Sequence, residues 1–183
     1  MPSARAQRKS DAIEPRSLAA RIAAVQVLYE IDMVGTPADT VLADFLERRA
    51  AASRDMADDR ADPEAADPAA GEADAEPRAA LLSELVRGAQ DRAAELDPLI
   101  ETVLRSERGL AGIDLVLRAI LRAGTYELAA RPQVPARVVV SQYCDIAGAF
   151  FDAPQEALAN AVLDRLARRF RAQEFTDDPA GAA

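Results

Sequence analysis

Apolar residues recur along this chain with the spacing of packed helices. The most regular stretch covers residues 114–128, with the sequence DLVLRAILRAGTYEL. On a helix at about 100° per residue, its main apolar positions share one arc of roughly 100°. The positions in this arc are Ile113, Leu117, Ile120, Leu121, Gly124 and Leu128. We therefore predict a helix with one core-facing side and expect the rest of the chain to be organised around it.

The opposite face of the same helix carries two cations and an aromatic ring. Arg118, Arg122 and Tyr126 follow the spacing i, i+4, i+8, so they stack along one side. Such a stripe fits a docking surface for a partner. It also fits a solvated face with one amphipathic tyrosine, which is the more common use of this pattern.

Six other stretches have helical periodicity, bounded by residues that cap or interrupt helices. They are predicted at residues 17–34, 37–46, 81–89, 98–104, 136–150 and 155–170. Ser17, Thr36 and Asp97 are the expected caps, and Gly35 ends the first of these helices. The best strand candidate, residues 138–140, is too short to be convincing. The predicted fold class is therefore all-α, with about seven helices.

Composition divides the chain into a helical domain with polar segments before, inside and after it. Residues 1–15 are polar and basic without an apolar period, and they are predicted to be a flexible arm. Residues 16–170 form the predicted helical domain. Inside it, residues 55–77 are expected to be a disordered acidic linker, because they contain almost no large apolar side chains. Residues 171–183 are expected to be a frayed tail.

Charge is distributed very unevenly. The formal net charge is −9, but residues 55–76 hold nine acids and one arginine, so this segment alone carries −8. Outside it the charge is close to neutral, and cations cluster in two regions, residues 5–21 and residues 165–171. Both clusters could meet an RNA backbone. Only one of the 22 cations is a lysine, and an arginine-rich, alanine-rich composition can also reflect biased codon usage.

The residue types present argue against an enzyme. The chain has no histidine, and Cys144 is its one cysteine, which rules out disulfides, most zinc sites and every histidine-dependent triad. No glycine-rich phosphate loop occurs, so neither a cofactor nor a metal is predicted. The sequence also lacks an apolar run of about 18 residues and the pattern of a signal peptide. We therefore expect a cytoplasmic protein without a membrane span.

Four short stretches, taken in their order and spacing, resemble the bacterial transcription antitermination factor NusB family. They are AVQVLY at residues 24–29, AILRAGTYEL at 119–128, Val134-Pro135 with the helix that follows, and NAVLD at 160–164. The similarity extends from about residue 16 to residue 169, apart from the acidic insertion. It implies an all-α fold of two small helical bundles packed on each other.

The resemblance further implies a role in antitermination. Members of the family bind single-stranded boxA RNA together with a small-subunit ribosomal protein, also called NusE, and the pair modifies RNA polymerase during ribosomal RNA synthesis. The RNA-binding residues that it implies here are Arg16, Arg21, Tyr29, Gln155, Leu158 and Asn160. It places Arg118, Arg122 and Tyr126 at or near the interface with the ribosomal protein.

Two other interpretations compete with this one. The chain could be an interaction adaptor that keeps the ribosomal-protein surface but binds RNA weakly. It could instead be the RNA-binding domain of an RNA methyltransferase, but no residues remain after Phe170 for a catalytic domain. The sequence leaves open whether the protein is a monomer or a homodimer.

Overall fold

The computed structural model describes residues 15–58, 68–104 and 109–176, and these segments are helical almost throughout. The α-helices are α2 (Pro15–Val34), α3 (Ala38–Asp58), α4 (Pro68–Asp91), α5 (Ala93–Leu104), α6 (Leu115–Ala130), α7 (Ala136–Phe150) and α8 (Ala153–Phe170). Two short 3₁₀ turns accompany them, η1 (Gly109–Gly112) and η2 (Ala172–Glu174). No strand occurs in the described segments, and the all-α prediction with seven helices is confirmed.

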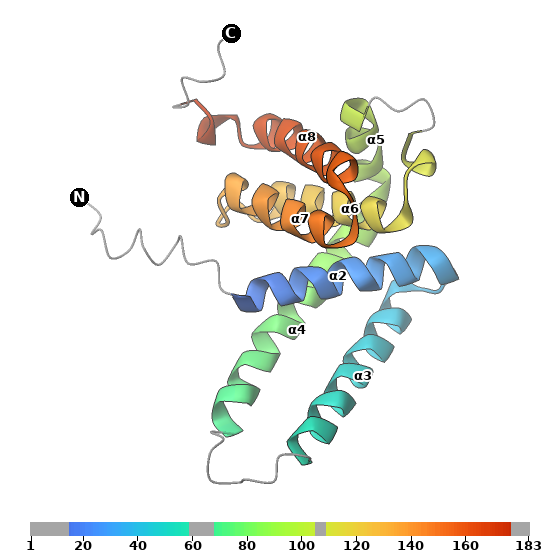
Figure 1. The fold of residues 1–183 in the computed structure, drawn as a ribbon, viewed down its shortest axis with the longest axis vertical. Helices are drawn as coiled ribbons and strands as arrows, with labels where there is room; N and C mark the ends of the chain where they lie inside the picture. Colours follow the sequence, from blue (N-terminus) through green and yellow to red (C-terminus); the bar gives the residue numbers. More distant parts are fainter. Residues whose placement is uncertain (1–14, 59–67, 105–108, 177–183) are drawn as a thin grey trace, which may run out of the picture.

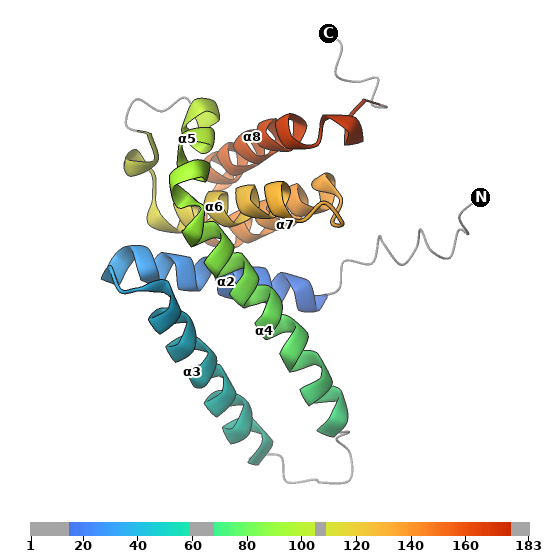
Figure 2. The ribbon, with the colours of Figure 1, turned by 180° about the vertical axis from the view of Figure 1, so that it is seen from behind.

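Helix α6 is the element around which the others are arranged. It packs against α2, α4, α5, α7 and α8, which confirms its predicted central position. Helices α3 and α4 extend together away from one side of α2, while α5, α7 and α8 gather with α6 on the other side (Figures 1 and 2). Helix α4 also contacts α6, so it joins the two groups of helices.

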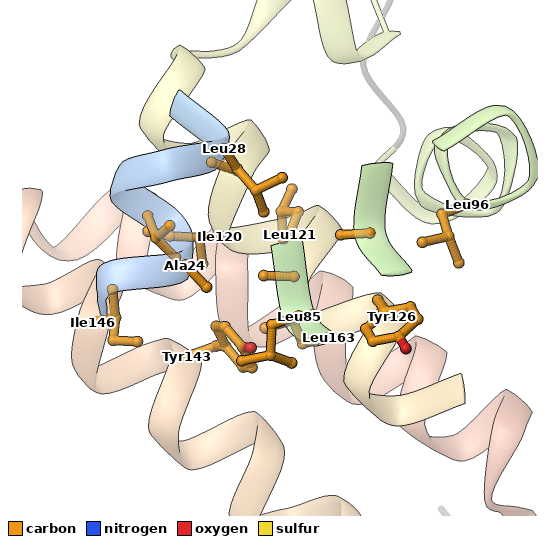
Figure 3. Packing of buried hydrophobic residues seen from close by; sticks show 14 of the residues in the cluster. Ala24, Leu28, Leu85, Leu96, Ile120, Leu121, Tyr126, Tyr143, Ile146 and Leu163 are labelled. Atoms are coloured by element: carbon orange, nitrogen blue, oxygen red, sulfur yellow. The ribbon is translucent and has the colours of Figure 1, made fainter. Parts of the chain in front are cut away.

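One continuous apolar core links these helices. Leu28 of α2, Leu85 of α4 and Leu121 of α6 point toward a common interior, beside Tyr143 of α7 and Leu163 of α8 (Figure 3). Each of these side chains is at most 2% exposed. Burying a large apolar side chain contributes roughly 1.5–3 kcal/mol, so side chains from five helices jointly stabilise the assembly.

Local sequence explains how α6 begins and why it is packed so closely. The Asp114 carboxylate accepts a hydrogen bond from the backbone N–H of Val116 at 2.7 Å and thereby caps the helix. In the middle, a Cβ atom added to Gly124 would lie 2.9 Å from the Leu163 side chain and 3.2 Å from Tyr143. Glycine at this position therefore lets α7 and α8 approach the α6 backbone.

Three predicted boundaries are wrong. Helix α3 continues to Asp58 and α4 begins at Pro68, so the segment predicted as a disordered linker at residues 55–77 is helical at both ends. The second of these ends, residues 68–77, is rich in alanine, the strongest helix former. Helix α5 begins at Ala93 rather than at Pro98, because the carbonyl of Arg92 already accepts bonds from the N–H groups of the first turn. Residues 59–67 lie outside the described segments.

The ends of the chain differ from the prediction in a similar way. Helix α2 begins at Pro15, and residues 1–14, most of the predicted basic arm, lie outside the described segments. Arg171, assigned to a frayed tail, is only 4% exposed, and η2 follows it. None of the described helices is long and apolar enough to cross a membrane.

Candidate functional site

The face of α6 predicted to be solvated or to dock a partner is largely covered by other parts of the chain. Tyr126 is only 9% exposed and lies against Gly88 of α4. A Cβ atom added to Gly88 would come within 2.0 Å of the tyrosine ring. Loss of solvent raises the pKa of Tyr126, with a further contribution from the Glu84 carboxylate. The prediction of an open tyrosine on this face is wrong.

The two arginines of the same stripe belong to a cluster of four charged residues, Asp32, Asp97, Arg118 and Arg122, which we call the Asp32 cluster. Arg122 donates two bonds of 2.7 Å to Asp97 of α5 and two of 3.0 Å to Asp32 of α2. Its side chain is 12% exposed, and its pKa is raised, chiefly by the hydrogen bonds to Asp97. Arg118 lies 3.7 Å from Asp32. Carboxylates from two other helices therefore satisfy Arg122, whereas Arg118 only lies near Asp32 and its buried Nε has no hydrogen-bond partner.

An exposed apolar edge adjoins the Asp32 cluster. Met33 and Val34, which directly follow Asp32 at the end of α2, are 56% and 65% exposed. These are the large apolar side chains most open to solvent among the described residues, together with Phe150 at the end of α7. Phe150 occupies the last position of its helix, beyond the packed turns.

Arg21, predicted to contact RNA, is almost completely buried. It is 3% exposed and donates from Nε to Glu127 of α6 at 2.9 Å and from Nη2 to the same carboxylate at 2.5 Å. Tyr143 of α7 donates its hydroxyl to Glu127 at 3.1 Å. Burial, followed by the nearby Glu127 charge, raises the pKa of Tyr143 well above its ordinary value.

The sequence contained a signal for the burial of Arg21. Ala24, Val25 and Leu28 lie three, four and seven positions later on α2, and each is at most 2% exposed. A residue with that spacing shares their helical face and must enter the core with them. Its partner Glu127 lies in the buried stretch of α6, more than 100 residues away, and periodicity cannot predict such a pairing.

The other predicted RNA-binding residues lie on two helices, α2 and α8. Tyr29 and Leu158 are half-buried and pack against the core. Gln155 and Asn160 are exposed on α8, and the Asn160 amide oxygen accepts a bond from the Cys144 thiol at 3.6 Å. The Arg16 side chain lies outside the described structure.

Asn160 lines a groove of about 660 Å³ between α7 and α8. Asp145 and Glu156 also line it, on either side of Cys144. Burial and these two carboxylates raise the pKa of the thiol to about 11, so it remains protonated and unreactive at neutral pH. Within the described segments, no group of three potential ligands among histidine, cysteine, aspartate and glutamate could hold a metal ion.

A second pocket, of about 260 Å³, lies between the start of α2 and the loop that joins α6 to α7. Arg21 and Arg131 line it together with Ser17 and Gln133. The sequence reasoning did not identify this pocket, because its walls come from four separate parts of the chain.

The buried side chain of Arg171 holds the α6–α7 loop in place through hydrogen bonds. It donates bonds of 2.8 Å to the carbonyls of Leu128 and Arg131 and one of 3.1 Å to that of Val134. The Glu174 carboxylate balances its charge at 3.0 Å. One buried side chain thus satisfies carbonyls at the end of α6 that have no partner inside the helix.

Comparison with known proteins gives a consistent result. The model of the NusB family matches residues 18–168. The transcription antitermination protein NusB of Rhodopseudomonas palustris (strain BisB18) is 38% identical over 175 residues, which cover 96% of this chain and 92% of that protein. The corresponding protein of Nitrobacter hamburgensis is 41% identical over 157 residues, covering 86% of this chain and 89% of that protein.

The fold comparison agrees. A solved structure of T. maritima NusB superposes with a TM-score of 0.64 at 21% identity, covering 88% of this chain and 97% of that chain. At this identity the likeness concerns the fold alone. The family match and the relatives establish that this chain belongs to the NusB family of transcription antitermination proteins.

Proposed function

We propose that this protein is a non-enzymatic RNA-binding antitermination factor. It binds boxA single-stranded RNA together with the ribosomal protein NusE, and the complex modifies RNA polymerase during ribosomal RNA synthesis. The observation that carries this proposal is membership of the NusB family over residues 18–168. The chain matches most of the length of its relatives, and these relatives are named transcription antitermination protein NusB.

The RNA contacts are proposed for the start of α2 and the start of α8. Gln155 and Asn160 are exposed on α8 and can reach unstacked bases. Arg16, in the first turn of α2, would attract the phosphates of the RNA backbone. Arg21 would act mainly through its ion pair with Glu127, which orients the start of α2. Tyr29 and Leu158 are half-buried, so only the solvent-exposed parts of their side chains would contact RNA.

The protein partner is proposed to bind beside the Asp32 cluster. Arg118, Arg122 and Tyr126 would shape this surface rather than form most of its contact area, because each is largely covered within the chain. Met33 and Val34 provide exposed apolar area next to the cluster. Apolar side chains of this kind are typical of the centre of a protein interface.

The burial of Arg21 favours a second candidate, an adaptor that binds the ribosomal protein but only weakly binds RNA. Removing one arginine from the RNA surface removes part of the electrostatic contribution on which affinity depends. Binding measurements distinguish the two candidates.

The test is fluorescence anisotropy with a boxA-like strand and a scrambled strand, over a range of salt concentrations, with and without the ribosomal protein. Selective binding that tightens with the partner supports the antitermination factor. Equal, weak binding to both strands, despite a formed protein complex, supports the adaptor. Met33→Ser with Val34→Ser should weaken the protein complex, whereas Ala50→Ser with Ala51→Ser on the exposed side of α3 should not.

A further inference from the structure

The pocket between α2 and the α6–α7 loop contains buried donors without acceptors. Arg21 is 3% exposed, and its Nη1 has no hydrogen-bond partner. Nε and Nη1 of Arg131 are also buried and unpartnered. The carboxylates facing Arg131 lie at 3.6 Å (Glu84) and 3.8 Å (Glu127), longer than a hydrogen bond. Since a buried donor without an acceptor is costly, this pocket favours a ligand that carries acceptor atoms.

The remaining walls also favour an anion. No acidic residue is among the described residues that line the pocket, whereas two arginines are. Ser17 brings the first turn of α2 to its edge. Backbone N–H groups at the start of a helix lack intrahelical partners and carry partial positive charge. They can therefore assist the arginines in holding a phosphate.

The pocket is held in shape by residues that do not touch its contents. Glu127 fixes Arg21 through two hydrogen bonds, and Arg171 fixes the loop that carries Arg131. Glu127 makes its hydrogen bonds with Arg21 and lies farther from Arg131, at 3.8 Å, so Arg131 is the arginine with more charge left for an anion. The other carboxylate near Arg131, Glu84, is 45% exposed and can turn toward solvent. Preorganised walls reduce the entropy lost when a ligand binds.

We propose that this pocket binds one phosphate group of the RNA backbone, with Arg131 and Arg21 as its side-chain donors. The proposal rests on the RNA-binding function proposed above and adds Arg131 to that site. A guanidinium matches the oxygens of a phosphate better than an ammonium does, because its donors form a planar fork.

The first experiment titrates the full chain with inorganic phosphate, against sodium chloride at matched ionic strength, and follows the arginine Nε–H signals by NMR. Saturable shifts of the Arg131 and Arg21 signals are expected in the wild type. In the Arg131→Gln variant, the Arg21 signal should no longer shift when phosphate is added. The matched control is Arg87→Gln, an exposed arginine on α4 paired with Asp39, which should keep both shifts. Shifts that fail to saturate in the wild type would overturn the proposal.

The second experiment measures the salt dependence of RNA binding with the same variants. Arg131→Gln should lower the log–log slope by about 0.7, the value of one phosphate contact on a single strand, and Arg87→Gln should leave it unchanged. Saturable phosphate binding combined with an unchanged RNA slope would overturn the assignment to RNA and identify a site for free phosphate.

The two experiments separate failure of this proposal from failure of the proposed function. If the wild type fails to select the boxA-like strand, the proposed function fails, while the phosphate titration still decides whether the pocket binds an anion. Should Arg131→Gln unfold the domain, Arg131→Lys keeps the charge and should weaken phosphate binding by removing the fork.

Discussion

Arg21 of α2 and Glu127 of α6 form an ion pair that is almost completely removed from water. Their side chains are 3% and 0% exposed, and Tyr143 of α7 adds a third hydrogen bond to the same carboxylate. Residues more than 100 positions apart thereby fix three helices together near the start of α2. Two charges at this depth are tolerated because each neutralises the charge of the other.

Breaking this pair is expected to cost more than any loss of RNA contact. Arg21→Ala should lower the free energy of unfolding by about 3–5 kcal/mol, because it leaves the Glu127 charge buried and unpaired. Urea denaturation followed by circular dichroism measures this. As a control, Arg48→Ala removes an exposed pair with Glu30 and should cost about 0–1 kcal/mol. Equal effects of the two substitutions would show that the buried pair has no special role in stability.

Gly88 is expected to tolerate no side chain. Gly88→Ala should destabilise the protein by roughly 1–3 kcal/mol, because the new methyl group would overlap the Tyr126 ring. Gly148→Ala is the matched control, since its nearest neighbour is the movable Glu156 carboxyl at 3.3 Å. There alanine should stabilise the helix by up to about 1 kcal/mol. Thermal unfolding of both variants decides the matter, and a neutral Gly88→Ala would contradict the close packing of α4 on α6.

Arg122 is expected to be structural as well as close to the proposed partner surface. Arg122→Ala should cost about 1–3 kcal/mol, less than a fully buried pair, because it leaves Asp32 and Asp97 without their shared cation. For a chain of this size each kcal/mol corresponds to a fall in Tm of about 2–4 °C. Asp39→Asn, on an exposed carboxylate paired with Arg87, serves as the control. An unchanged Tm together with weaker partner binding would instead make Arg122 purely an interface residue.

Cys144 is expected to react slowly in the folded protein. A pKa of about 11 in place of 9.0 lowers the thiolate fraction at neutral pH about 100-fold. Iodoacetamide labelling at pH 7.5, followed by mass spectrometry, should therefore be slower in native protein than in urea, by about 10-fold or more, because the higher nucleophilicity of the less acidic thiolate offsets part of the 100-fold. Comparable rates in the two states would indicate that the thiol is neither desolvated nor flanked by the carboxylates of Asp145 and Glu156.

The same shift predicts weaker folding in alkali. Because the folded pKa of Cys144 lies above its unfolded value, the unfolded chain loses this proton first, and stability falls as the pH rises from 9.0 to about 11. The raised pKa of Tyr143 acts in the same direction at higher pH. Urea midpoints between pH 8 and pH 11 measure the effect, and Cys144→Ala should flatten the first part of the decline. A wild-type midpoint independent of pH would contradict both shifts.

The local sequence pattern was sufficient to predict the helical class, the central position of α6 and the apolar side of that helix. Leu117, Ile120, Leu121 and Leu128 were predicted to face inward and are at most 1% exposed. These features follow from a period of 3.6 residues, which depends only on neighbours along the chain. The family could likewise be recognised from short stretches in a fixed order, because such motifs are properties of the sequence.

Which charged residues face water depends instead on contacts between distant segments. Arg21, Arg122 and Arg171 were assigned to an RNA surface, a partner surface and a frayed tail, yet each is held by groups from other segments. Long-range contacts of this kind leave no periodic signal, because the partners are fixed by how whole helices cross. The phosphate pocket depends on the same effect, since α2 and the α6–α7 loop become neighbours only after the core has formed around α6.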